Sequence, residues 1–80
     1  MLSELETGKR VVGVKQSKKA IKDGVAAKVF LAEDAEDRVR APFVEACGKG
    51  RIEIEMVPAM RELGAACGID VGAAVAVLIK

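Results

Sequence analysis

Apolar residues along this chain recur at two different spacings, and the spacing changes from segment to segment. A nearly continuous apolar run at residues 27–32 predicts a strand that is covered on both faces. Ile52, Ile54 and Met56 alternate with two glutamates, which predicts a strand with one solvated face near the edge of a sheet. Because such alternation is not typical of a purely parallel sheet, we expect a mixed one.

The other segments complete an alternating series of helices and strands. Helices are predicted at residues 1–7, in a lysine-rich segment that ends at Gly24, at residues 42–47 after one acidic turn, and at residues 59–67. Strands are predicted at residues 10–14, 27–32, 52–56 and 73–79. This order predicts an α/β fold, a three-layer α/β/α sandwich with a four-stranded mixed sheet. At this length we expect one domain over residues 1–80.

Glycine and proline mark the predicted helix boundaries. Gly24, Gly48 and Gly68 each follow a helical segment, as is typical of a left-handed C-cap. Pro42 suits the first position of a helix. Ala59 is a weak N-cap for the last helix, where Ser, Thr or Asp would bond a free backbone N–H.

The composition makes an enzyme hard to build. The sequence has no histidine, the commonest general base. Glu53 and Glu55 share a strand face, but that face is predicted to be solvated and not to line a cleft. Cys47 and Cys67 stand alone, each before a glycine, and are expected to be buried thiols without a disulfide. We therefore expect no catalysis, no metal site and no cofactor.

Nothing in the sequence predicts a membrane association. The N-terminus has two glutamates and lacks an apolar signal segment. The longest uncharged run, residues 71–79, is shorter than the roughly 20 residues that span a bilayer. We expect a cytoplasmic monomer.

The cations are concentrated in one part of the chain. Residues 9–28 hold seven cations and one anion, which leaves six cations and eleven anions elsewhere. Within this segment, Lys15, Gln16 and Lys19 have the spacing that places them on one helical surface near the helix N-terminus. Free N–H groups and the positive end of the dipole lie there, so a polyanion such as a phosphate backbone is a natural partner. The alternative is an ordinary solvated lysine-rich face.

Two phenylalanines cannot form a platform for stacking several bases, so capture of long single strands is not expected. Regular A-form RNA hides its base edges in a narrow major groove. A helix end that carries Gln16 and lysines therefore fits a kinked or bulged RNA better than a uniform duplex.

Residues 12–20, 29–35, 57–64 and 67–74 have the order and spacing of the matching segments in a known protein family. Through these segments the chain resembles the kink-turn-binding ribosomal protein family of the archaeal "L-seven-Ae" type, in its bacterial YbxF-like branch. The archaeal Asn, Glu and Lys of the helix motif fall on Lys15, Gln16 and Lys19. Gln16 keeps an acceptor without the charge, and Lys15 cannot accept a hydrogen bond from a base.

The resemblance implies an α/β/α sandwich that binds kink-turn RNA, a helix–bulge–helix motif with sheared G·A pairs. In this family the loop after the last helix packs apolar residues on an extruded nucleotide. For Ile69 an ordinary contact with its own helix is an equally good interpretation. The implied RNA-binding residues are Gly13, Val14, Lys15, Gln16, Ser17, Lys18, Lys19, Lys22, Ile69, Asp70, Val71 and Gly72.

The function predicted from the sequence is recognition and stabilisation of kink-turn RNA, with Gly13 allowing close approach and Arg10 adding longer-range charge. The RNA partner could be ribosomal RNA, a riboswitch or another non-coding RNA, and the protein could be associated with the ribosome. The alternative is a protein–protein interaction module that uses the basic helix, with vestigial or non-specific RNA binding.

Overall fold

A computed structural model describes residues 3–80 of the chain. Four helices and four strands alternate, as predicted. They are α1 (Ser3–Thr7), β1 (Arg10–Val12), α2 (Val14–Lys22), β2 (Ala26–Ala32), α3 (Asp37–Gly50), β3 (Glu53–Val57), α4 (Met60–Ala66) and β4 (Val75–Ile79). Residues 1 and 2 of the first predicted helix lie outside the described residues.

The strands form one mixed sheet in the order β1-β4-β2-β3. β4 runs antiparallel to both of its neighbours, and β3 runs parallel to β2. The predicted mixed sheet is confirmed, but the reason given for it was wrong, because the alternating strand β3 is the parallel one. Its alternation reflects its position at the edge of the sheet. The burial of Met56 was also predicted wrongly, since Met56 is 41% exposed and the neighbouring Val57 is buried.

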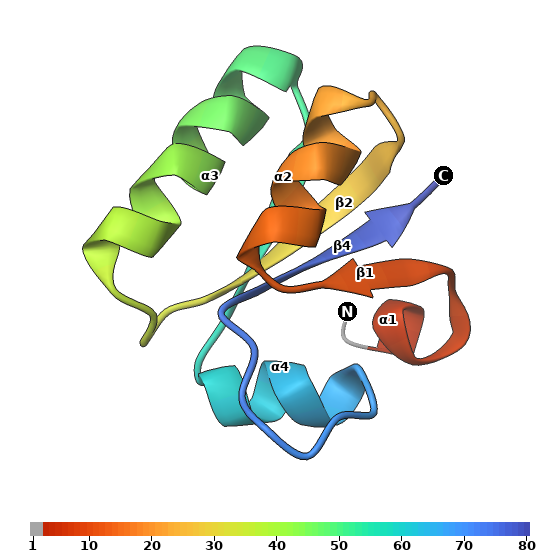
Figure 1. The fold of residues 1–80 in the computed structure, drawn as a ribbon, viewed down its shortest axis with the longest axis vertical. Coiled ribbons are helices and arrows are strands. Elements are labelled where there is room, and N and C mark those ends of the chain that lie inside the picture. Colours follow the sequence, from red (N-terminus) through yellow and green to blue (C-terminus); the bar gives the residue numbers. More distant parts are fainter. Residues whose placement is uncertain (1–2) are drawn as a thin grey trace.

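Helices cover both faces of the sheet, which confirms the three-layer sandwich (Figure 1). α2 and α3 lie on one face, where Phe43 packs on Val29, Leu31, Val75 and Val77. α1 and α4 lie on the other face, where Leu5 and Leu63 pack on Phe30, Val57 and Ala76. Each face therefore has its own apolar core, and β2 and β4 contribute to both cores because they lie in the middle of the sheet.

The two cysteines are buried and free, one in each core. Cys47 lies on the side of α2 and α3, and Cys67 on the side of α1 and α4. Burial raises the pKa of both thiols, because a thiolate is poorly solvated in an apolar core. The sheet separates the two side chains, which excludes a disulfide between them within one folded chain.

Two predicted boundaries near α2 and α3 were wrong. The first strand ends at Val12, because Gly13 has φ 100° and ψ 160°, and the helix begins at Val14. α3 is one continuous helix of 14 residues with Pro42 in its interior. It ends at Gly50, beyond Gly48, and its C-cap residue Arg51 has φ 53°. Phe43, which is 1% exposed, anchors this helix, so packing outweighs the backbone hydrogen bond that Pro42 removes.

Lys28 makes a charged contact at the edge of the α1 and α4 side. Its Nζ lies 3.1 Å from Glu4 of α1, and 3.2 Å and 2.9 Å from Glu53 and Glu55 of β3. It also lies 5.1 Å from the ring centroid of Phe30. Lys28 is only 8% exposed, so this buried cation links α1 to the edge strand and covers the end of the core. Glu53 and Glu55, which share a strand face as predicted, are thus neighbours of a structural lysine.

Replacing Lys28 with Met should lower the free energy of unfolding by about 2 kcal/mol at neutral pH. This value lies between the typical cost of breaking an exposed ion pair and that of breaking a buried one, because water can hydrate the carboxylates that remain. The hydrogen bond to Glu55 raises the pKa of Lys28 above its ordinary 10.5, although burial lowers it. A lysine whose pKa is raised by folding stabilises the folded state fully at pH values below its unfolded pKa. This stabilisation is lost as the pH rises above the unfolded pKa toward the folded pKa. Urea unfolding at about pH 7, 9 and 11 should therefore show a constant difference that shrinks only above about pH 10.5. A difference that widens there would contradict this assignment.

Within the described residues, none of the helices is long and apolar enough to cross a membrane.

Candidate nucleic-acid interface

The N-terminus of α2 lies at the end of the sheet where β1 ends and β4 begins. Gly13 joins β1 to α2, and its N–H donates a hydrogen bond of 2.9 Å to the carbonyl of Val75. Its backbone conformation is nearly restricted to glycine. A Cβ built on Gly13 would meet no atom within 4 Å, so the space beside it is open to a ligand. The close approach of RNA at Gly13 stays a prediction, and this geometry leaves room for it.

The first turn of α2 has no anionic cap. The first hydrogen bond of the helix runs from the N–H of Ser17 to the carbonyl of Gly13. The N–H groups of Val14, Lys15 and Gln16 precede it and point out of the helix end. Gly13 has no capping side chain, and the first turn contains no acidic residue. This helix end therefore combines free donors, the positive end of the dipole and the nearby Lys15.

The other two helices that start at this end of the sheet carry their own anions. α3 has Asp37 in its first turn. At α4, the N–H of Met60 donates a hydrogen bond of 2.8 Å to Oδ1 of Asp34, from the loop after β2. Ala59, a weak N-cap by sequence, is therefore assisted by a residue far away in the chain. Of these three helix N-termini, that of α2 is the one left without a nearby anion, so it can bind an external one.

Exposed lysine side chains line α2 along its length, beginning at its free end. Lys15, Gln16, Lys18, Lys19 and Lys22 are all exposed. Among residues 3–80, no carboxylate pairs with any of these four lysines, although the structure has ion pairs elsewhere. Unpaired cations of one sign on one helix repel each other, and an external polyanion would relieve that repulsion.

Not every predicted cation belongs to this surface. The Nη2 of Arg10 donates a 2.9 Å hydrogen bond to the carbonyl of Cys67, at the end of α4. Lys28 is surrounded by carboxylates on the α1 side. The guanidinium of Arg10 thus stabilises a helix C-terminus, and the longer-range charge assigned to it stays a prediction. Lys18 and Lys22 lie farther along α2 and border a cleft with α3.

Two more predicted contact residues are used by the core. Ser17 has no exposed surface, and its hydroxyl has no hydrogen-bond partner among the described residues. The side chain of Val14 packs against the α2 and α3 core and is only partly exposed. The RNA contact that the resemblance implied for Ser17 stays a prediction, but Ser17 has no exposed surface with which to make it. Its position on the inner stripe with Ala20, recognisable by helical spacing, already indicated burial.

Replacing Ser17 with Ala should leave any binding at α2 unchanged and should raise the free energy of unfolding by about 1 kcal/mol. The reason is that the substitution removes a buried hydroxyl that makes no hydrogen bond. Urea unfolding and an RNA titration of the same sample measure the two effects separately. Loss of affinity without loss of stability would place Ser17 in the interface after all.

The loop after α4 forms the second part of the candidate interface (Figure 1). It runs from Gly68, with φ 76°, back to β4 beside the start of α2. Ile69, Asp70, Val71 and Gly72 are all exposed, and Val71 is 70% exposed. The exposed Val71 adds an apolar contact on a loop that joins β4 at the free end of α2, where the N–H of Gly13 bonds to the carbonyl of Val75.

Close packing on α4 holds this loop in place. The N–H of Ile69 bonds to the carbonyl of Gly64 at 3.1 Å, and the N–H of Ala73 bonds to the carbonyl of Met60 at 3.0 Å. A Cβ built on Gly64 would lie 2.0 Å from the carbonyl oxygen of Val71. Gly64 therefore lets the loop lie directly on the helix. Gly64 was not among the predicted site residues. A glycine inside a helical pattern was the signal that could have indicated this close packing.

The comparisons with known proteins agree with this architecture. A family model for the ribosomal protein L7Ae/L30e/S12e/Gadd45 family matches residues 2–80. The chain belongs to this family. The match covers the segments of both parts of the candidate interface, the start of α2 and the loop after α4.

Bacterial members of the family are close in sequence. An RNA-binding protein of Caldanaerobacter subterraneus is 50% identical over 68 residues, which cover 85% of this chain and 83% of that protein. The RNA-binding protein YbxF of Geobacillus stearothermophilus is 37% identical over 76 residues, which cover 95% of this chain and 93% of that protein.

Solved structures of the same fold match nearly the whole chain. A 15.5 kD RNA-binding protein of Giardia lamblia has a TM-score of 0.91 at 24% identity, covering 99% of this chain and 70% of that one. A protein of unknown function from Bacillus halodurans has a TM-score of 0.88 at 25% identity, covering 99% and 83%. These likenesses confirm the fold of the L7Ae/L30e/S12e/Gadd45 family for this chain.

Proposed function

We propose that this protein binds RNA and stabilises its kink-turn form. The observation that carries the proposal is the pairing of an uncapped helix end with an exposed apolar loop. The start of α2 offers free N–H groups and the unpaired cations Lys15 and Lys19, and Val71 lies exposed on the loop that returns beside it. The naming of its bacterial relatives as RNA-binding proteins supports the same partner.

A continuous duplex would use this interface poorly. A regular A-form helix presents phosphates to the lysines but offers no unpaired nucleotide to Val71. A kinked RNA opens its major groove to the end of α2 and extrudes a nucleotide toward the loop. The difference in affinity between kinked RNA and a continuous duplex is therefore larger for the whole interface than for the lysines alone.

The side chains at the start of α2 differ in the RNA groups that they can contact. The amide of Gln16 both donates and accepts hydrogen bonds, so it can pair with a base edge. The ammonium groups of Lys15 and Lys19 only donate, which suits phosphates and the acceptor edge of guanine. Gly13 keeps the backbone free of a side chain where the RNA would approach.

Binding energy alone can bend the RNA. If free RNA exchanges between extended and kinked forms, a protein with higher affinity for the kinked form shifts the population toward it. The shift equals the difference in affinity, so about 1.4 kcal/mol of preference changes the ratio tenfold. Neither an energy source nor a catalytic step is required.

The deciding experiment titrates the protein into a kink-turn RNA labelled at both ends, and into a continuous duplex of matched length and composition. Binding and end-to-end distance are followed together at a low and a high salt concentration. We expect tighter binding to the kink-turn, with the two labels approaching each other. The preference should persist at high salt, because salt weakens the phosphate contacts common to both RNAs.

Equal, weak and salt-sensitive binding to both RNAs would overturn the proposal. It would leave the basic helix as an electrostatic surface and would favour the alternative, a module that docks an acidic protein partner.

A further inference from the structure

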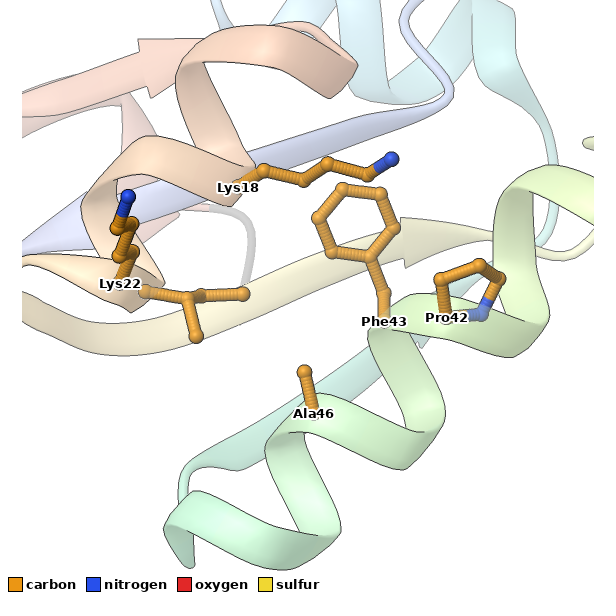
Figure 2. A pocket seen from close by; sticks show the side chains of 6 residues that line it. Lys18, Lys22, Pro42, Phe43 and Ala46 are labelled. Carbon is orange, nitrogen blue, oxygen red and sulfur yellow. The ribbon is translucent and has the colours of Figure 1, made fainter.

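A cleft between α2 and α3 is not used by the proposed kink-turn interface. It has a volume of about 270 Å³ and is lined by Lys18, Ile21 and Lys22 of α2 and by Pro42, Phe43 and Ala46 of α3. Figure 2 shows Lys18 of α2 extending over the Phe43 ring, with Lys22 one turn farther along α2 and pointing away from that ring, and with Pro42 and Ala46 beside Phe43 on α3. The short side chains of Pro42 and Ala46 leave this space between the two helices open.

The cleft has an apolar interior and a cationic rim. The Phe43 ring, which is 1% exposed, forms part of its floor, and the aliphatic groups of Ile21, Pro42 and Ala46 form its walls. Lys18 and Lys22 lie one helical turn apart on the rim, and no carboxylate lines the cleft. A ligand that fits therefore combines a small apolar body with negative charge outside it.

The size of the cleft limits that apolar body. Pockets for drug-sized ligands hold roughly 300–1,000 Å³, so this cleft is at or below the smallest of them. It can take one planar ring or one side chain, whereas an added helix would need a long groove. An unpaired nucleobase with its own phosphates meets both requirements, since the ring is apolar on its faces and its backbone is anionic.

We propose that this cleft takes one unpaired nucleotide from a single-stranded segment of RNA already bound at the end of α2. The base lies against Ile21 and Pro42, and the adjoining phosphates contact Lys18 and Lys22. The cleft has no polar group on its floor, so it accepts different bases with little discrimination.

Proximity favours RNA over an acidic peptide as the occupant. α2 has nine residues, so its helix is only about 13 Å long. A strand held at Lys15 thus passes near Lys18, and its entry into the cleft is an intramolecular step with a high effective concentration. A separate acidic peptide has no such tether. The inference rests on the proposed RNA function, because the tether is the RNA bound at α2.

The test compares a blunt kink-turn RNA with the same RNA carrying short oligouridine tails on both arms. For the unmodified protein we expect the tails to raise affinity roughly 5-fold or more, the lower limit for one sequence-tolerant base contact. Tails with 4-thiouridine should crosslink to residues of the cleft. Replacing the tail bases with abasic sites should remove most of the gain.

Two matched variants test whether the gain in affinity from the tails comes from the cleft. Ala46→Leu fills the cleft with a good helix former and should abolish the gain from the tails while the affinity for blunt RNA stays unchanged. Ala41→Leu makes the same change at an exposed position of α3 that does not line the cleft, and should retain the gain. Urea unfolding of both variants confirms that they are folded.

The outcomes separate this inference from the proposed function. Failure to bind the blunt kink-turn in preference to duplex RNA would remove the proposed function itself. Normal binding of the blunt RNA with no gain from the tails, or an equal gain in Ala46→Leu, would overturn the cleft proposal alone. Tight binding of a short acidic peptide with one leucine, blocked by Ala46→Leu while the tails add nothing, would also overturn it and assign the cleft to a protein partner.

Discussion

The double variant Lys15→Ala, Lys19→Ala should bind kink-turn RNA about 100-fold more weakly than the unmodified protein at low salt. Each of the two ammonium groups is exposed and unpaired, and both lie at the uncapped start of α2. A hydrogen bond to a charged group contributes roughly 1.5 kcal/mol or more, so two of them account for about 3 kcal/mol. Because the lysines also release counterions, the slope of log K against log salt should become shallower by about 1.5.

A control with the same change of charge tests whether position matters. Lys49→Ala, Lys80→Ala removes two exposed lysines, one from the far end of α3 and one that follows β4. This control should lose only a few-fold in affinity, through the smaller overall attraction. If both double variants lose the same affinity and the same slope, the protein attracts RNA by its total charge, and the end of α2 is not the contact surface.

Gly64→Ala should destabilise the protein by about 3 kcal/mol and should also weaken RNA binding. The added Cβ would lie 2.0 Å from the carbonyl oxygen of Val71 and 3.1 Å from Cα of Gly72. Both are backbone atoms, so the loop must move away from α4, which is the cost of overpacking a rigid contact. Moving the loop displaces Val71 and breaks the hydrogen bond from Ile69 to the carbonyl of Gly64.

Gly48→Ala provides the matched control for this substitution. Gly48 also lies inside a helix, but a Cβ there would meet no atom within 4 Å. Helix propensity alone should then raise the free energy of unfolding by about 0.5–1 kcal/mol, with RNA affinity unchanged. Urea unfolding and an RNA titration of each variant make the comparison. A Gly64→Ala protein as stable as Gly48→Ala would show that the loop does not rest on α4 as described.

Local pattern was sufficient for the order of the elements. Every helix and strand was predicted in sequence, because a periodicity of two or of 3.6 is a property of neighbouring residues. Gly24 and Gly68 do end their helices in the left-handed region, as predicted, since only the local backbone decides that conformation. The position after a C-cap glycine did not decide the exposure of Ile69 and Val71, since an apolar residue there can also pack back on its helix.

The errors have a common physical origin in contacts between distant residues. Gly48 was wrongly predicted to end α3 because the packing of Phe43 on β2 carries the helix through Pro42 and beyond. The partners of Arg10 and Lys28 were not predicted for the same reason, because Arg10 bonds to Cys67 and Lys28 pairs with Glu4, Glu53 and Glu55. Nothing in their own neighbourhood along the chain indicates those partners.

Local spacing and aligned segments were enough to predict the α/β/α order, the family resemblance and the basic helix. The folded structure was needed to establish that β3 is parallel to β2, that Asp34 caps α4, and that Ser17 is buried. It also decided that the free end of α2, and not that of α4, is open to an anion. Pairing of strands and capping across loops depend on which segments meet in space, and a one-dimensional pattern holds no information on that meeting.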